Sequence, residues 1–179
     1  MGVEIERRFL VDGRGEKPWR RGVPKSIVQF YLEDVEITGD KINWNGEVLT
    51  KTLESLDDID TWRVRRIDEK YILTAKGRRK GPTASEYEWE VSEHIWKMVD
   101  AMDLPGVIKV RYCWKNEDGY LWEVDEYNGI LSGLIIAEVE LEEETEQFAI
   151  PDWAKLELTH LDGWSNSALS AMIRDSKQN

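Results

Sequence analysis

Apolar and polar residues alternate along most of the chain, and this period of two is typical of β-strands with one buried face. The alternating segments are residues 3–10, 27–35, 41–53, 61–66, 71–75, 85–91, 108–114, 120–125 and 135–142. Two dipeptides between apolar strand residues favour hairpin turns because both residues tolerate a positive φ, Asn45-Gly46 and Asp118-Gly119. The pattern predicts a predominantly antiparallel β fold.

Two segments have helical spacing instead. Ser92 is suited to cap a helix that ends before Pro105 and has apolar residues at i, i+3, i+4 and i+7 spacing, namely Ile95, Met98, Val99 and Met102. A second helix is predicted near residues 166–174, with four side chains facing inward, Ala168, Leu169, Met172 and Ile173. The expected fold class is therefore α+β, with a few helices around the sheet.

The polar faces of the strands carry almost only charged side chains, and most strands carry a single sign. Because alternate side chains share a face, the acids form sets at 4/6, 86/88/90, 123/125 and 138/140, and the bases at 63/65 and 109/111. A sheet with one solvated face is the simplest explanation. Such faces usually mix neutral and charged residues, however, and like charges two residues apart repel each other. The repetition over six strands favours a ligand that compensates the charge.

A closed barrel would bring these faces together. An interior of about eight strands is wide enough for side chains or one small ligand. Carboxylates suit divalent cations such as Mg²⁺ or Mn²⁺, and paired arginines bind phosphate oxygens with two parallel hydrogen bonds. A lumen that holds both predicts a metal-bound polyphosphate as its ligand. The apolar alternates, including many Trp and Tyr residues, would then face outward against helices or a partner subunit.

Composition narrows the remaining possibilities. The chain has 179 residues, with 24 basic and 36 acidic side chains and a net charge of −12, which argues against nucleic acid as a partner. No apolar run approaches the roughly 20 residues of a membrane span. The charged residues 4–8 do not resemble a secretory signal, so we expect a cytoplasmic protein with no membrane partner. No linker divides the sequence, which predicts one domain over residues 1–179.

The segment Glu4-Ile5-Glu6-Arg7-Arg8 resembles the N-terminal ExExK signature of the CYTH, or triphosphate tunnel metalloenzyme, family. The resemblance continues in order and approximate spacing through Arg63-Val64-Arg65, Leu73-Thr74-x-Lys76, Glu86-Tyr87-Glu88, Lys109-x-Arg111, Glu123-Val124-Asp125 and Glu138-Val139-Glu140. It implies a closed eight-stranded antiparallel β-barrel that binds a small-molecule triphosphate in its lumen. It also implies an enzyme that depends on Mg²⁺ or Mn²⁺.

The same resemblance assigns roles to single residues. Those that match the family's metal ligands are Glu4, Glu6, Glu123, Asp125, Glu138 and Glu140. Those that match its triphosphate-binding positions are Arg8, Arg63, Arg65, Lys76, Lys109 and Arg111. The expected catalytic set is Glu88, Glu90 and Lys76, in which the two glutamates would orient basic side chains or assist the attacking water.

The chain also departs from the family pattern. Arg8 stands where the signature has Lys, and a forked guanidinium is not interchangeable with a compact ammonium. Val28, Phe30 and Ala84 replace residues that are usual in short bacterial members. The segment near residues 37–60 is longer than its counterpart and carries its own hairpin. It could cap one end of the tunnel, form an interface or be a surface addition.

Three functions follow from the resemblance. The first is hydrolysis of inorganic triphosphate to pyrophosphate and phosphate, preferred because no adenine or thiamine pocket is evident. The second is a class IV type adenylate cyclase or a nucleoside triphosphatase on the same fold. The third is a polyphosphate- or nucleotide-binding module without catalysis. The Trp-rich exterior suggests a homodimer in each case.

Overall fold

The computed structural model describes residues 2–177. The strands are β1 (Gly2–Val11), β2 (Pro24–Leu32), β3 (Glu36–Thr38), β4 (Lys41–Trp44), β5 (Glu47–Lys51), β6 (Ile59–Ile67), β7 (Lys70–Gly77), β8 (Thr83–Glu90), β9 (Gly106–Lys115), β10 (Leu121–Tyr127), β11 (Ile135–Glu140) and β12 (Ala154–Glu157). The α-helices are α1 (Glu93–Asp100) and α2 (Asn166–Lys177), and two short 3₁₀ helices are η1 (Pro18–Arg21) and η2 (Gly129–Leu131).

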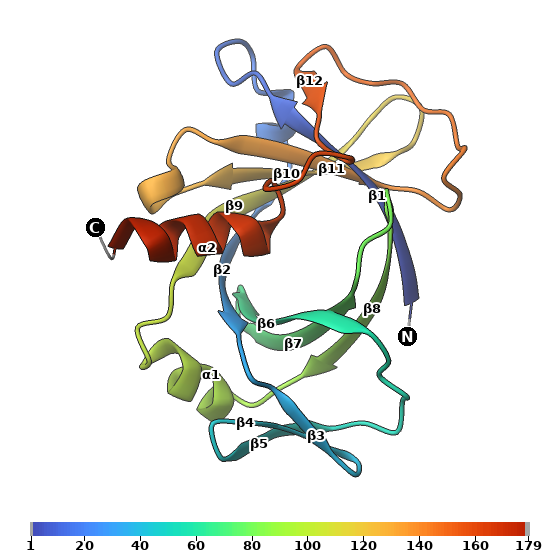
Figure 1. The fold of residues 1–179 in the computed structure, drawn as a ribbon. Coiled ribbons are helices and arrows are strands. Elements are labelled where there is room, and N and C mark those ends of the chain that lie inside the picture. The colour runs from blue at the N-terminus through green and yellow to red at the C-terminus, as the bar shows by residue number, and fades with distance from the viewer. Residues whose placement is uncertain (1, 178–179) are drawn as a thin grey trace.

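Eight strands close into an antiparallel barrel in the order β1-β8-β7-β6-β2-β9-β10-β11, with β11 paired to β1 (Figure 1). The closure depends on β1, because its residues 2–5 pair with β8 and its residues 6–10 pair with β11. The short β12 pairs beside the end of β1, opposite Phe9 and Val11. The predicted fold class, a closed eight-stranded antiparallel barrel with few helices, is confirmed.

The apolar faces of the strands point out of the barrel, as predicted, and other elements cover them. One cluster joins Val64 and Leu73 of the wall to Trp96 of α1. A second joins Trp122 of the wall to Trp19 of η1 and to residues that follow β11. Two aromatic residues do not face outward as predicted. Tyr31 lines the lumen and Tyr127 is buried with residues of α2, because each has the parity of the charged side chains on its strand.

The segment near residues 37–60 covers the outer wall of the barrel. Its strands β3, β4 and β5 form a separate three-stranded sheet. The predicted Asn45-Gly46 turn joins β4 to β5, with both residues at positive φ. Three side chains of this sheet, Ile42, Trp44 and Leu49, are buried against β2, β6 and α1. The segment therefore completes a hydrophobic core on the outside of the barrel.

Helix α2 lies across part of one end of the barrel, next to β9 and β2 (Figure 1). Its buried residues Leu169 and Ile173 contact lumen-facing apolar side chains, among them Val107 and Ile136. Met172, predicted to face inward, is 59% exposed because the contact surface follows a narrower stripe of the helix. Among residues 2–177, no helix is both long and apolar enough to span a bilayer.

We expect Leu169→Ala to lower the free energy of unfolding by about 2–4 kcal/mol, because Leu169 is 3% exposed and its loss leaves a cavity under α2. Urea denaturation measures this change. Met172→Ala on the same helix is the matched control and should change stability by less than about 0.5 kcal/mol. Equal losses in both variants would contradict the described packing of α2.

Candidate active site

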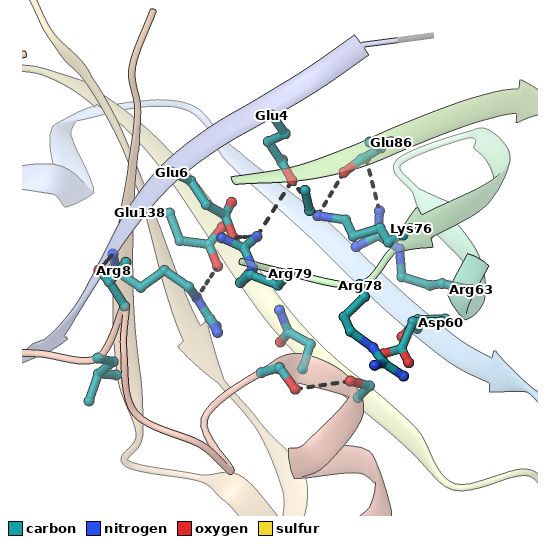
Figure 2. Close-up of a pocket in the computed structure, with 18 of the residues that line it drawn as sticks. Glu4, Glu6, Arg8, Asp60, Arg63, Lys76, Arg78, Arg79, Glu86 and Glu138 are labelled. Atoms are coloured by element: carbon teal, nitrogen blue, oxygen red, sulfur yellow. Dashed lines mark hydrogen bonds and ion pairs between the residues drawn. The ribbon is translucent and has the colours of Figure 1, made fainter. Parts of the chain in front are cut away.

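The lumen contains a cavity of about 930 Å³ whose wall is polar and charged (Figure 2). Because alternate residues of each strand face inward, every barrel strand sends side chains toward the lumen. The loop after β7, the segment after β12 and the start of α2 complete the lining. The charged residues around the cavity include Glu4, Glu6, Arg8, Arg63, Arg65, Lys76, Arg79, Glu86, Glu88, Arg111, Glu123, Glu138 and Glu140.

Carboxylates gather on β1, β10 and β11. The strand register places Glu6 opposite Glu140 and Glu123 opposite Glu138. Like charges directly opposite each other destabilise a sheet. Burial, and then the charges of Glu138 and Glu4, raise the pKa of Glu6 to about 7. Burial also raises the pKa of Glu4 and of Glu140. Repulsion between the carboxylates of this wall therefore lowers the stability of the folded protein, and a bound cation would offset that loss.

The donor set of this wall fits a hard divalent cation, because Mg²⁺ and Mn²⁺ prefer carboxylate oxygens. Among the described residues, no three carboxylates converge on one point. Basic side chains contact them instead: Lys76 Nζ lies 2.6 Å from Glu4 Oε2, and the Arg79 guanidinium is paired with Glu6. The carboxylates belong to neighbouring strands of the barrel, β1, β10 and β11.

Basic side chains gather on the opposite wall, on β6 and β7, and each has a carboxylate partner on β8. Arg65 Nη2 donates to Glu88 Oε1 at 2.9 Å, and Lys76 Nζ lies 2.6 Å from Glu86 Oε2. Arg63 Nη2 donates to Thr74 Oγ1 at 3.0 Å. The Nε groups of Arg63 and Arg65 are buried without a hydrogen-bond partner among the described residues. Both guanidinium groups therefore keep one donor that no described residue satisfies.

Arg111 on β9 binds carboxylates of β10 and β11 through a buried network. It donates from Nε to Asp125 Oδ1 at 2.7 Å and from Nη2 to Glu138 Oε2 at 3.2 Å. Asp125 also accepts from Lys109 Nζ. Although burial raises the pKa of Glu138, the charges of Arg8 and Arg111 hold that pKa below its usual range. Burial lowers the pKa of Lys109 to about 8. Asp125, which both Lys109 and Arg111 contact, lies behind Arg111 and fixes its position.

The structure brings most of the predicted site residues to the cavity, but three lie elsewhere. Asp125 and Lys109 are 0% and 2% exposed and do not line the cavity. Their strand parity is that of the lumen, but they are covered by Arg111 and Glu138. Glu90 is also absent from the lining, since it ends β8 opposite Ile72. The geometry gives these three residues no direct contact with a ligand in the cavity.

Several residues that line the cavity were not predicted from the sequence. Arg78 and Arg79 follow β7, and Arg79 pairs with Glu6 and contacts the carbonyl of Pro82 at 2.8 Å (Figure 2). Asp60 lines the cavity at the start of β6. The alternation of a strand cannot identify loop residues. The run of basic residues 78–80, between two strands with charged inner faces, was the sequence feature that could have indicated these loop residues.

Known proteins resemble this chain along much of its length. The family model of the CYTH domain matches residues 51–169. An inorganic triphosphatase of Acetivibrio thermocellus is 33% identical over 172 residues, 94% of each chain. An inorganic triphosphatase of Nitrosomonas europaea is 33% identical over 114 residues, 62% of this chain and 75% of that protein. The crystal structure of the inorganic triphosphatase NE1496 has a TM-score of 0.60 and 29% identity, covering 95% of both chains.

We expect Asp125→Asn to destabilise the protein by about 3–5 kcal/mol in the presence of a chelator, because Lys109 would stay buried without its charged partner. Urea denaturation measures the loss. Glu123→Gln on the same strand face is the control, since its side chain is 37% exposed and should contribute less than about 1 kcal/mol. A loss for Asp125→Asn that appears only with added Mg²⁺ would instead make Asp125 a metal ligand.

The raised pKa of Glu6 predicts how stability varies with pH. The folded state binds a proton at Glu6 more tightly than the unfolded state, whose pKa is 4.5. In chelator, this contribution is fully present below pH 4.5 and is lost as pH rises toward about 7, by about 3 kcal/mol at most. Thermal unfolding from pH 5 to 8 should show a fall in Tm that Glu6→Gln reduces. An identical pH profile for both proteins would refute the assignment.

Proposed function

The chain belongs to the CYTH domain family, and we propose that it hydrolyses inorganic triphosphate to pyrophosphate and phosphate with Mg²⁺ or Mn²⁺ as cofactor. The observation that carries the proposal is one cavity in which carboxylates gather on β1, β10 and β11 and basic side chains gather on β6 and β7. A metal-bound chain of phosphates has complementary charge at both walls. Two relatives at 33% identity, both named inorganic triphosphatase, support the same activity.

Glu4, Glu6, Glu138 and Glu140 are the proposed metal ligands, with Glu123 at the edge of the same group. A divalent cation bound there supplies charge neutralisation for phosphate oxygens and a lower pKa for a bound water. These four carboxylates would hold the cation, since they come from two paired strands of the closed barrel. Lys76 and Arg79, which contact Glu4 and Glu6, would then be available to phosphate oxygens.

The basic residues of the cavity bind and align the phosphate chain. Arg63, Arg65 and Arg111 offer planar groups with several donors, which suit the spacing of phosphate oxygens. Fixed donors around the transferred phosphoryl group stabilise the charge that develops in the transition state. Glu88 contributes by holding Arg65 at 2.9 Å, while Asp125 holds Arg111 from behind. Glu88 and Asp125 are therefore positioning residues in this proposal.

We also propose that residues 1–179 act as one domain. The first strand pairs with the last strand of the chain, β12, and with β11, so the barrel cannot be divided along the sequence. The same pairing makes the ExExK-like segment of β1 the common neighbour of the acidic strand β11 and of β8.

We expect Glu4→Gln and Glu138→Gln to lower kcat for triphosphate at least about 100-fold, because each removes a charge from the metal site. Phosphate release in Mg²⁺ or Mn²⁺ measures the activity, and thermal unfolding checks that each variant is folded. Glu47→Gln, exposed on the outer sheet, is the control and should keep full activity. Full activity in both site variants would refute the metal-site assignment.

Product analysis with inorganic triphosphate, ATP and pyrophosphate tests the reaction itself. Metal-dependent release of phosphate from triphosphate, with slower turnover of ATP, is the expected result. Formation of cyclic AMP from ATP would identify a cyclase instead. Intact substrates in every metal, together with thermal stabilisation by triphosphate, would identify a binding module without catalysis.

A further inference from the structure

Arg79 extends from the loop between β7 and β8 toward the carboxylates of β1 (Figure 2). Its Nη2 is paired with Glu6 Oε1 and lies 3.7 Å from Glu4 Oε2. Because alternate residues share a strand face, Glu4 and Glu6 both face the lumen from β1. A cation that bridged these two carboxylates would lie between their oxygens, and the Arg79 guanidinium carries its positive charge at that place.

The backbone of this loop is held in place independently of the Arg79 side chain. Lys80 and Thr83 exchange two backbone hydrogen bonds, of 2.8 and 3.2 Å. The carbonyl of Pro82 accepts from the backbone N–H of Glu6 at 3.1 Å, which attaches the end of the loop to β1. The Arg79 side chain is 29% exposed. It can therefore turn away from Glu6 toward solvent while the strands stay paired.

Lys76 also contacts Glu4 but is held differently. It belongs to strand β7, and its Nζ lies 2.6 Å from Glu86 Oε2 as well as 2.6 Å from Glu4 Oε2. If Lys76 lost Glu4 to another cation, it would keep Glu86 as its partner. Among the described residues, the ion pairs of Arg79 are with Glu4 and Glu6 only. Any group that takes these two carboxylates therefore displaces Arg79 entirely.

Ala84 leaves room for the contact between Arg79 and β1. It pairs with Glu4 in the register of β1 and β8, and it lines the cavity. A longer side chain at this lumen-facing position would reach the space beside Glu4 that the Arg79 guanidinium uses. Ala84 is one of the departures from the family pattern. The small residue on β8 thus admits the arginine of the preceding loop.

We propose that Arg79 is an internal counter-ion of the metal site, which competes with the divalent cation for Glu4 and Glu6 and thereby sets the metal affinity. The inference rests on the proposed function, because it takes these two glutamates as metal ligands. A protein binds a ligand more weakly when only a fraction of its molecules has the site free, in proportion to that fraction. The guanidinium therefore lowers the metal affinity, and it stabilises the carboxylates whenever the cation leaves. The exchange of one for the other leaves neither glutamate without a positive partner.

Two variants of the same loop separate competition from a general effect of charge. Arg79→Gln removes the guanidinium that contacts Glu4 and Glu6. Arg78→Gln is the matched control, since it removes the same charge from the neighbouring position, which lines the cavity but has no ion pair with Glu4 or Glu6 among the described residues. Calorimetric titration with Mn²⁺, without triphosphate, measures the affinity of the metal site. Thermal unfolding in chelator and in saturating Mn²⁺ compares the stability of the free and metal-bound proteins.

We expect Arg79→Gln to bind Mn²⁺ at least about fivefold more tightly than Arg78→Gln, because its carboxylates need no release from a guanidinium. In chelator its Tm should lie below that of the wild type, since buried Glu6 loses a charged partner. In saturating Mn²⁺ that difference should disappear, whereas a merely structural role of Arg79 would keep it. Equal Mn²⁺ affinities of the two variants, no binding to either, or an unchanged Tm difference would overturn the proposal.

The same measurements distinguish this proposal from the proposed function. Hydrolysis of triphosphate by the wild type, together with equal Mn²⁺ affinities of the two variants, would refute the competition alone. Tighter binding of Mn²⁺ by Arg79→Gln, without hydrolysis of triphosphate by the wild type, would refute the proposed function, and the competition would stand.

Discussion

Charge inside a small barrel is the constraint on which the rest of this structure depends. Eight strands leave room for side chains from every strand, and here the inner positions of most strands are Glu, Asp, Lys or Arg. The apolar positions must then face outward, where water would otherwise meet them. The sheet β3–β5, helix α1 and the segment around β12 supply the missing cover. The peripheral elements are therefore a consequence of the charged lumen.

The charges are paired across strands, yet the pairing is incomplete. Lys76 contacts carboxylates on β1 and on β8, and Arg111 contacts carboxylates on β10 and β11. Glu6 and Glu140 nevertheless stay opposite each other, and three arginines keep buried nitrogens without partners. The lumen thus has two unmet electrostatic needs, for a cation beside the carboxylates and for an anion beside these arginines. A complex of both meets the two needs together.

Much of this arrangement follows from the sequence, because parity along a strand determines which face a side chain takes. Parity located Glu4, Arg63 and Glu138 correctly in the lumen. It does not reveal depth along the barrel axis: Asp125, which the resemblance matches to a metal ligand, lies behind Arg111. It is also silent in loops, where Arg79 lies. The strands β3 and β12 were missed because three or four residues are too few to show a period.

The outward aromatic face affects how this protein can be observed. Eight of its nine tryptophans belong to the two clusters on the outer wall. The remaining one, Trp164, lies just before α2, and its carbonyl accepts a hydrogen bond from Arg8. Most of the tryptophan fluorescence should therefore report the unfolding of these two clusters. The part of the signal that responds to an occupied lumen would come from a single fluorophore, Trp164.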